Sequence, residues 1–169
     1  MVVVDKFSRF AHFIPISHPY TALSIARLFL DNVYKLHSMP VSIISDRDPI
    51  FTSVFWKELF RLAGTQLRMS SSYHPQTDGT TERVNQSLEA FLRCFAQVCP
   101  RKWADWLSLA EYWYNTNWHS APNKTPFEVL YNHQPRHFGI VSCQVTNLQE
   151  WFDERSAVTA ILRQQLLRV

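Results

Sequence analysis

The hydrophobic pattern at the start of the chain changes from that of short strands to that of a helix. Residues 2–4 and 10–14 are β-prone runs that flank the polar segment 5–9, which predicts an antiparallel hairpin. A helical period then begins after Thr21, which can serve as the N-cap, and Pro40 forbids its continuation. The first long helix is therefore predicted from the apolar positions Leu23, Ala26, Phe29, Leu30, Val33 and Leu36.

Strands and helices continue to alternate in the middle of the chain. Val41, Ile43 and Ile44 predict a buried strand that ends at the polar run 45–49, and apolar spacing then predicts a helix that stops at Gly64. A short strand near residues 66–69 follows. The polar, turn-rich segment 70–79 precedes a helix over about 80–98, and segments of this composition are typical of exposed, functional loops.

The last third of the chain is predicted to be helical. An aromatic helix is marked by Trp103, Trp106, Leu107, Ala110 and Tyr114. Thr125 and Pro126 open a short helix, and a capping pattern at 147–150 opens a final helix to residue 169 whose apolar face must be buried. We therefore expect an α/β protein with a mixed sheet flanked by helices, antiparallel at the side of the hairpin. Residues 1–138 form the core domain in this interpretation, and 139–169 a linker and C-terminal amphipathic helix.

Composition excludes several classes of protein. Apolar residues make up 46% of the 169 residues, enough to bury one sizeable core. The three glycines are too far apart to form a phosphate-binding loop, and the longest uncharged apolar run, residues 1–4, is far below the ~20 residues that cross a membrane. Dinucleotide-binding, P-loop and membrane-spanning functions are not expected.

Charge and cysteine content are less decisive. The net charge of +3 permits nucleic-acid binding without indicating it. Three cysteines without a Cys-x-x-Cys pair indicate neither a disulfide framework nor a zinc site, and fit a reducing, intracellular compartment. We expect the seven scattered histidines to lie at the surface or to support other groups.

Two acidic residues are candidates for metal chemistry. Asp46 follows a predicted strand, and Glu82 lies in the first turn of a predicted helix, so that both can lie over the same sheet edge. Paired carboxylates bind Mg²⁺, which shares its coordination shell with phosphates, and two such ions support in-line phosphoryl transfer. The spacing alone is weak evidence, because 14 acids among 169 residues give about one such pair by chance.

The sequence around these acids is more specific. Residues 44–51 (ISDRDPIF) resemble the second-aspartate motif of retroviral and retrotransposon integrase cores, and 73–85 (YHPQTDGTTERVN) resemble the mobile loop and glutamate motif of that family, at its spacing of 35 residues. Residues 2–13 and 125–131 are similar to the gypsy-type branch of LTR retrotransposons. The resemblance covers roughly residues 1–138.

The resemblance implies a ribonuclease H-like fold and Mg²⁺- or Mn²⁺-dependent joining of retroelement DNA ends to target DNA. It also implies homo-oligomers and a nuclear location, although no targeting signal is seen. Asp46 and Glu82 match the second and third members of the metal-binding triad. The first member matches no residue here, because it belongs to a strand that precedes residue 2 in the family. Asp5 instead matches the aspartate of the hairpin turn, so we expect weak metal binding and no activity from this chain.

Other residues are candidates for contacts with DNA. Tyr73, His74 and Gln76 lie on the loop with which relatives contact DNA, where they serve either that contact or the structure of the loop. Asn85 can orient Glu82 or reach DNA, and Arg83 is a phosphate contact or an ordinary solvated charge. Retroviral relatives carry basic residues one and two turns beyond the glutamate, where this chain has Gln86 and Glu89.

Three further expectations concern structure and function. Asp48 caps the following helix, and the tryptophans Trp103, Trp106, Trp113 and Trp118 serve core and subunit packing rather than base stacking. The missing aspartate leaves open a non-catalytic relic or recruited domain that binds DNA or a protein. A ribonuclease H-type nuclease is disfavoured by the loop motif and the Thr-Pro-Phe-Glu segment.

Overall fold

The N-terminal hairpin forms as the sequence predicts. In the computed structural model, which describes residues 1–70, 79–96 and 100–136, β1 (Val2–Val4) pairs antiparallel with β2 (Ala11–Phe13). Asp5 closes the turn, since its Oδ2 accepts hydrogen bonds from the backbone N–H and the hydroxyl of Ser8 at 2.6 and 2.7 Å. Asp5 is therefore a turn residue, as expected.

The first long helix is also confirmed, with an internal irregularity. Helix α1 (Ala22–Phe29) continues as a π-helical turn, η1 (Leu30–Tyr34), and ends as α2 (Lys35–His37). The side chains of Thr21 and Ser24 form a reciprocal capping box at its start. At its end Ser38 has a φ of 61°, which turns the chain toward Pro40.

The second pair of strands is parallel. β3 (Ser42–Ser45) pairs with β4 (Gln66–Met69) through the crossover helices α3 (Pro49–Thr52) and α4 (Val54–Leu62). The Asp48 carboxylate accepts the Ile50 N–H at 2.8 Å and caps α3, as predicted. Helix α4 ends before Gly64, whose φ of +71° lies in the region that glycine adopts without strain.

The expectation that β3 is buried is wrong. Val41, just before the strand, is 84% exposed and Ile44 is exposed, whereas Ile43 packs against the helices. Only one face of β3 is covered in the described part of the chain, so alternate side chains face outward.

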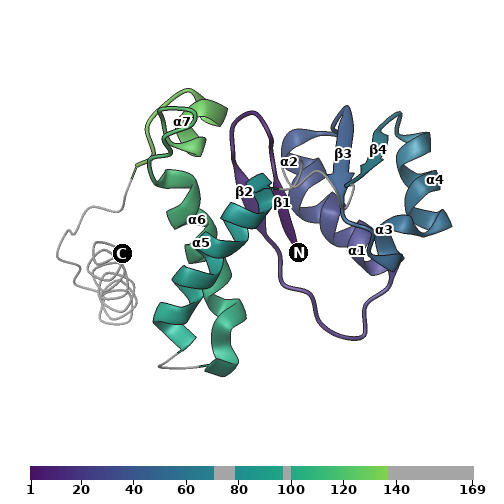
Figure 1. Ribbon diagram of the computed structural model, residues 1–169, viewed down its shortest axis with the longest axis horizontal. Helices are drawn as coiled ribbons and strands as arrows, with labels where there is room; N and C mark the ends of the chain where they lie inside the picture. Colours follow the sequence, from purple (N-terminus) through teal and green to yellow (C-terminus); the bar gives the residue numbers. More distant parts are fainter. Residues whose placement is uncertain (71–78, 97–99, 137–169) are drawn as a thin grey trace, which may run out of the picture.

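Within the described residues, the four strands form two separate two-stranded sheets rather than one continuous mixed sheet. Among the described residues, no strand pairs with the edge of β1 that faces away from β2, or with the edge of β3 that faces away from β4. Figure 1 shows the hairpin standing between two groups of helices, with β3 and β4 beside α1 to α4. The α/β class with flanking helices is confirmed, and the single sheet is corrected to two.

Four elements complete the described fold: α5 (Gly79–Ala96), the 3₁₀-helix η3 (Pro100–Trp106), α6 (Leu107–Thr116) and α7 (Pro126–Tyr131). The aromatic helix predicted from Trp103 thus begins as a 3₁₀ segment. Thr125 and Glu128 form the capping box of α7. No described helix is long and apolar enough to span a bilayer. The predicted C-terminal helix and the division at residue 138 lie outside or at the end of the described residues and stay predictions.

Buried side chains form two clusters, one on each side of the hairpin. The first core cluster joins the hairpin to α5 and α6, and its buried members are Ala11, Phe13, Val84, Phe91, Leu107, Ala110 and Tyr114. The second joins it to α1 and α4, and comprises Ile14, Ile25, Ala26, Phe29, Val33, Trp56 and Phe60. Val2 and Val4 pack against the first and Val3 against the second, because successive strand residues point to opposite faces.

Side chains of α6 take the place of a neighbouring strand at the outer edge of β2. Asn115 accepts the Ala11 N–H and donates to the Ala11 carbonyl, both at 2.8 Å. Glu111 accepts the Phe13 N–H at 2.8 Å. Residues four apart share one face of a helix, so α6 lies along β2 and satisfies these backbone groups.

We predict that Asn115→Ala lowers the free energy of unfolding by about 2–4 kcal/mol, because it leaves a buried backbone donor and acceptor of Ala11 without partners. Chemical denaturation measures this loss. The matched control is Asn117→Ala, at an exposed asparagine, for which we expect a change within about 0.5 kcal/mol. Equal effects from both variants would contradict the pairing.

Candidate functional site

Asp46 lies where the chain leaves the parallel pair of strands. It follows β3 directly and is exposed, and its Oδ1 accepts the Asp48 N–H at 3.1 Å. The Ser70 N–H donates to the Ser45 carbonyl at 2.8 Å, so β4 ends beside the residue that precedes Asp46. The parallel pairing thus fixes the backbone on which Asp46 stands.

Glu82 is in the first turn of α5 and is exposed. Burial of Val84 and Phe91 in the first core cluster sets the rotation of this helix and leaves Glu82 on the outward side. Arg9, in the hairpin turn, donates from Nη1 to the Thr80 hydroxyl at 2.5 Å and so ties the start of α5 to the hairpin. The position of Glu82 therefore depends on the hairpin.

The two carboxylates supply oxygen ligands but not a complete metal site. Within residues 1–70, 79–96 and 100–136, no group of three or more His, Cys, Asp or Glu side chains is arranged to hold an ion. The prediction that Asp46 and Glu82 share a cation stays a prediction. Since both are exposed, each can reach an ion or a phosphate-bound ion without burying its charge.

The DNA-contact candidates divide into two groups. Arg83 and Asn85 are exposed on α5 next to Glu82, and the Arg83 side chain is in no ion pair with any other described residue. Tyr73, His74 and Gln76 lie outside the described residues. Further along α5, Arg93 pairs with Glu89 at 3.4 Å, so part of its charge is compensated locally.

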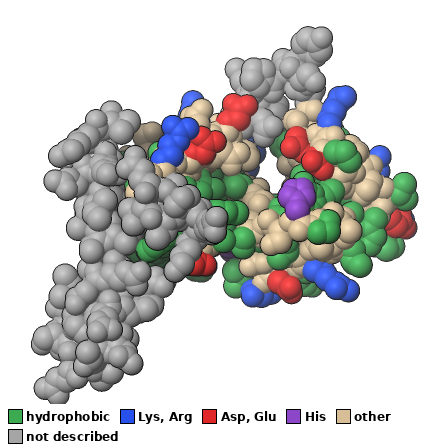
Figure 2. Space-filling view, turned by 90° about the horizontal axis from the view of Figure 1, so that it is seen from below, with side chains coloured by type: hydrophobic (Ala, Val, Ile, Leu, Met, Phe, Trp, Pro, Cys, Tyr) green, Lys and Arg blue, Asp and Glu red, His purple; other side chains and the backbone are tan. Residues whose placement is uncertain are grey.

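Charged side chains of both signs are mixed on the face of the described residues that Figure 2 shows. Figure 2 shows lysine and arginine side chains spread over the visible face, with acidic side chains between them. This distribution agrees with the modest net charge of +3.

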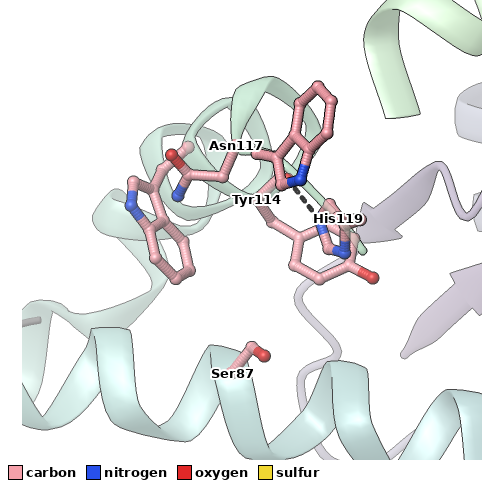
Figure 3. A pocket seen from close by; sticks show the side chains of 6 residues that line it. Ser87, Tyr114, Asn117 and His119 are labelled. Atoms are coloured by element: carbon pink, nitrogen blue, oxygen red, sulfur yellow. Dashed lines mark hydrogen bonds between the residues drawn. The ribbon is translucent and has the colours of Figure 1, made fainter. Parts of the chain in front are cut away.

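A hollow of about 400 Å³ lies between α5 and the end of α6, lined by Ser87, Trp113, Tyr114, Asn117, Trp118 and His119. In Figure 3, Ser87 faces the hollow from one helix, opposite Tyr114, Asn117 and His119. The His119 ring nitrogen Nε2 is 3.1 Å from the Tyr114 carbonyl oxygen. This hollow is formed by residues other than the two carboxylates.

Core packing is confirmed for two of the four tryptophans, and the prediction of subunit packing stays a prediction. Trp106 and Trp113 pack against the first core cluster, and the Trp113 ring lies 5.3 Å from that of Phe91. Trp103 and Trp118, in contrast, are 43% and 62% exposed. Helical spacing could not reveal this because Trp103 lies in the 3₁₀ segment and Trp118 beyond the end of α6.

Four polar residues that connect the hairpin to neighbouring helices were not identified from the sequence: Arg9, His12, His37 and Glu111. His12 is buried, which excludes a surface position and leaves the expected role of supporting other groups. One signal was available, since His12 is the only polar residue in the apolar run 10–14. The partners of His12 come from distant segments and leave no local pattern.

Comparison with known proteins decides the family. No family model matches the chain. The Transposon Tf2-3 polyprotein of Schizosaccharomyces pombe is 38% identical over 158 residues, which is 94% of this chain and 12% of the polyprotein. The catalytic core of BIV integrase superposes with a TM-score of 0.60 at 26% identity, covering 78% of this chain and 84% of that one. The chain belongs to the retrotransposon integrase family.

More distant structures support the same fold. The HTLV-2 integrase catalytic core in complex with magnesium has a TM-score of 0.62 at 22% identity, over 76% of this chain and 81% of that one. A chain of the simian T-cell lymphotropic virus intasome in complex with PP2A regulatory subunit B56 gamma has a TM-score of 0.66 at 22% identity, over 85% and 51%. This integrase chain therefore has the ribonuclease H-like fold, and it spans about an eighth of the curated polyproteins that it matches.

Proposed function

We propose that this integrase segment binds DNA and holds one divalent cation, Mg²⁺ or Mn²⁺, between Asp46 and Glu82. The observation that carries the proposal is the placement of these acids at a strand end and in the first turn of a helix, within a fold shared with integrase cores. A carboxylate in a first helical turn is also stabilised by the helix dipole.

The residues fit the cation chemically. Mg²⁺ prefers oxygen ligands and retains several waters, so two exposed carboxylates suffice for a weak site. When bound, the ion supplies positive charge that polarises a phosphate. The chain itself contributes the orientation of the ligands: the Asp48 N–H holds one oxygen of Asp46, and the Arg9 to Thr80 hydrogen bond holds the start of the helix that carries Glu82.

We infer that Arg83 contacts a DNA phosphate and Asn85 either DNA or the Glu82 carboxylate, since both flank Glu82 on the exposed side of α5. Tyr73, His74 and Gln76 are further candidates on the preceding segment. Retroelement ends and target DNA are the substrates that we propose, in the nucleus and within a homo-oligomer. The related HTLV-2 core exists in trimeric and dimeric forms, which supports the last point.

A second candidate function is DNA binding without catalysis. Only two members of the family's carboxylate triad match residues of this sequence, and the described residues offer no third carboxylate to such a site. Because the members of a catalytic constellation act as a unit, loss of one typically costs orders of magnitude in rate.

We therefore expect no detectable strand transfer by residues 1–169, measured with a labelled duplex. Robust Mg²⁺-dependent transfer that Glu82→Gln abolishes would refute this and favour an active enzyme.

The cation prediction is tested by titration. We expect calorimetry, or paramagnetic line broadening by Mn²⁺, to show at most one weak site that Asp46→Asn and Glu82→Gln each eliminate, because only two protein ligands are available. The matched control is Asp31→Asn, at an exposed aspartate of η1, which should leave the titration unchanged. Two tight sites, or binding that survives Asp46→Asn, would contradict the assignment.

The DNA prediction concerns Arg83. We expect Arg83→Ala to weaken binding of duplexes of any sequence and to reduce the slope of log affinity against log salt by about 1, because one phosphate contact is lost. Fluorescence anisotropy at several salt concentrations measures both quantities. Arg61→Ala is the control, since Arg61 is on α4 and paired with Glu58 at 2.6 Å. Identical salt slopes for the wild type and Arg83→Ala would remove Arg83 from the interface.

A further inference from the structure

A chain of three ionisable side chains connects elements that are far apart in the sequence. The His12 ring nitrogen Nδ1 lies 3.0 Å from Glu111 Oε1, and its Nε2 lies 2.8 Å from Nε2 of His37. His12 comes from β2, His37 is the last residue of α2, and Glu111 is on α6. The cluster therefore crosses the hairpin and touches helices on both of its sides.

The surroundings keep water from His12, the middle member of this cluster. His12 is 7% exposed, and the Phe10 ring lies 5.3 Å from the His12 ring and 5.9 Å from that of His37. The other carboxylate oxygen of Glu111, Oε2, accepts a hydrogen bond from the Phe13 N–H. The carboxylate thus has a set orientation toward His12.

The geometry determines where the protons lie. Glu111 accepts a hydrogen bond, so Nδ1 of His12 carries a proton. Two imidazole nitrogens at 2.8 Å can share only one proton between them, and a neutral His12 accepts at Nε2 the N–H of His37. If both rings become doubly protonated, two N–H groups face each other and two positive charges repel.

Charged groups from three elements act on His37. Burial and His12 lower its pKa from the ordinary value of 6.5, whereas Asp5 in the hairpin turn and Glu111 on α6 act in the opposite direction, and the net result is a lowered pKa. A folded-state pKa below the unfolded value means that the neutral ring stabilises the fold. This contribution is fully present above pH 6.5 and is lost as the pH falls from there through the lowered pKa.

We propose that Glu111, His12 and His37 form a proton-operated clasp that positions the segment leading from α2 to β3 and Asp46, and that the clasp opens when the imidazoles of His12 and His37 are both protonated. His37 and Asp46 are separated by a turn at Ser38 and the short strand β3. Opening does not unfold this segment, because the Pro40 carbonyl accepts the Thr65 hydroxyl at 2.7 Å and Ile43 stays packed in the second core cluster. It frees α2 from the hairpin.

The cluster is better suited to sharing a proton than to binding a metal. Two nitrogens that ligate one tetrahedral zinc ion at about 2.0–2.1 Å lie farther apart than 2.8 Å. Among the described residues, no group of three or more His, Cys, Asp or Glu side chains is arranged to hold a metal ion, and this cluster is no exception. The positioning role rests on the proposed function only in its last step, the use of Asp46 as a ligand.

His37→Gln is the decisive variant, because a glutamine amide can donate to Nε2 of His12 but does not titrate. We expect the wild-type free energy of unfolding to fall between pH 7.5 and pH 5, and the His37→Gln variant to lose measurably less over the same range. The matched control is His18→Gln, at an exposed histidine outside the cluster, which should keep the wild-type dependence. Equal pH dependence in all three proteins would overturn the clasp.

Nuclear magnetic resonance of the wild-type imidazoles keeps the proposal testable if the variant fails to fold. We expect His12 as the Nδ1–H tautomer, a titration of His37 below 6.5, and a pH-dependent amide shift at Asp46 that follows it. A His37 pKa at its ordinary value, or an Asp46 amide chemical shift that does not change as His37 titrates, would overturn the assignment.

Two further outcomes concern metals. Stabilisation by zinc at neutral pH that His37→Gln abolishes would replace the clasp by a metal site. Failure of Mg²⁺ to bind Asp46 would refute the proposed function and leave the clasp intact.

Discussion

The pairing of α6 side chains with the outer edge of β2 is the contact on which the rest of the structure depends. A two-stranded hairpin is marginally stable alone, and this one separates the first and second core clusters. Asn115 and Glu111 satisfy the backbone groups that β1 does not reach. The hairpin can therefore present Ala11 and Phe13 to one cluster and Ile14 to the other.

The two candidate metal ligands belong to different structural units that meet at this hairpin. Glu82 is carried by α5, which packs on β1 and is tied to Arg9. Asp46 is carried by the parallel pair β3 and β4, which packs with α1 and α4. Their relative position consequently depends on contacts of the hairpin with both units, rather than on any direct bond between the two acids. This arrangement gives residues such as Arg9 and His12 an influence on a site that they do not touch.

What the sequence could predict was local. The caps at Thr21, Asp48 and Thr125, and the helix end at Gly64, depend on hydrogen bonds or dihedral angles within a few residues. The hairpin depends on two neighbouring runs and was predicted for the same reason. The motifs around Asp46 and Glu82 are likewise contiguous stretches of sequence, and they indicate the family by themselves.

What the sequence could not predict depends on distant partners. The exposure of Val41 follows from which face of β3 the helices cover, and the division into two sheets follows from the spatial relation of β1 and β3. The burial of His12 requires Glu111 and His37, which lie 99 and 25 residues away in the chain. No window of local sequence contains these pairs.

The sequence distance between β2 and α6 also imposes an order on folding. The hairpin can close as soon as its residues are available, but Ala11 finds Asn115 only 104 residues later. Contacts between residues so far apart in the sequence form slowly, and during synthesis they cannot form until α6 has left the ribosome. Until then β2 exposes an open edge that can pair with another chain. The edge of β2 is therefore unprotected in the nascent protein until α6 has been made.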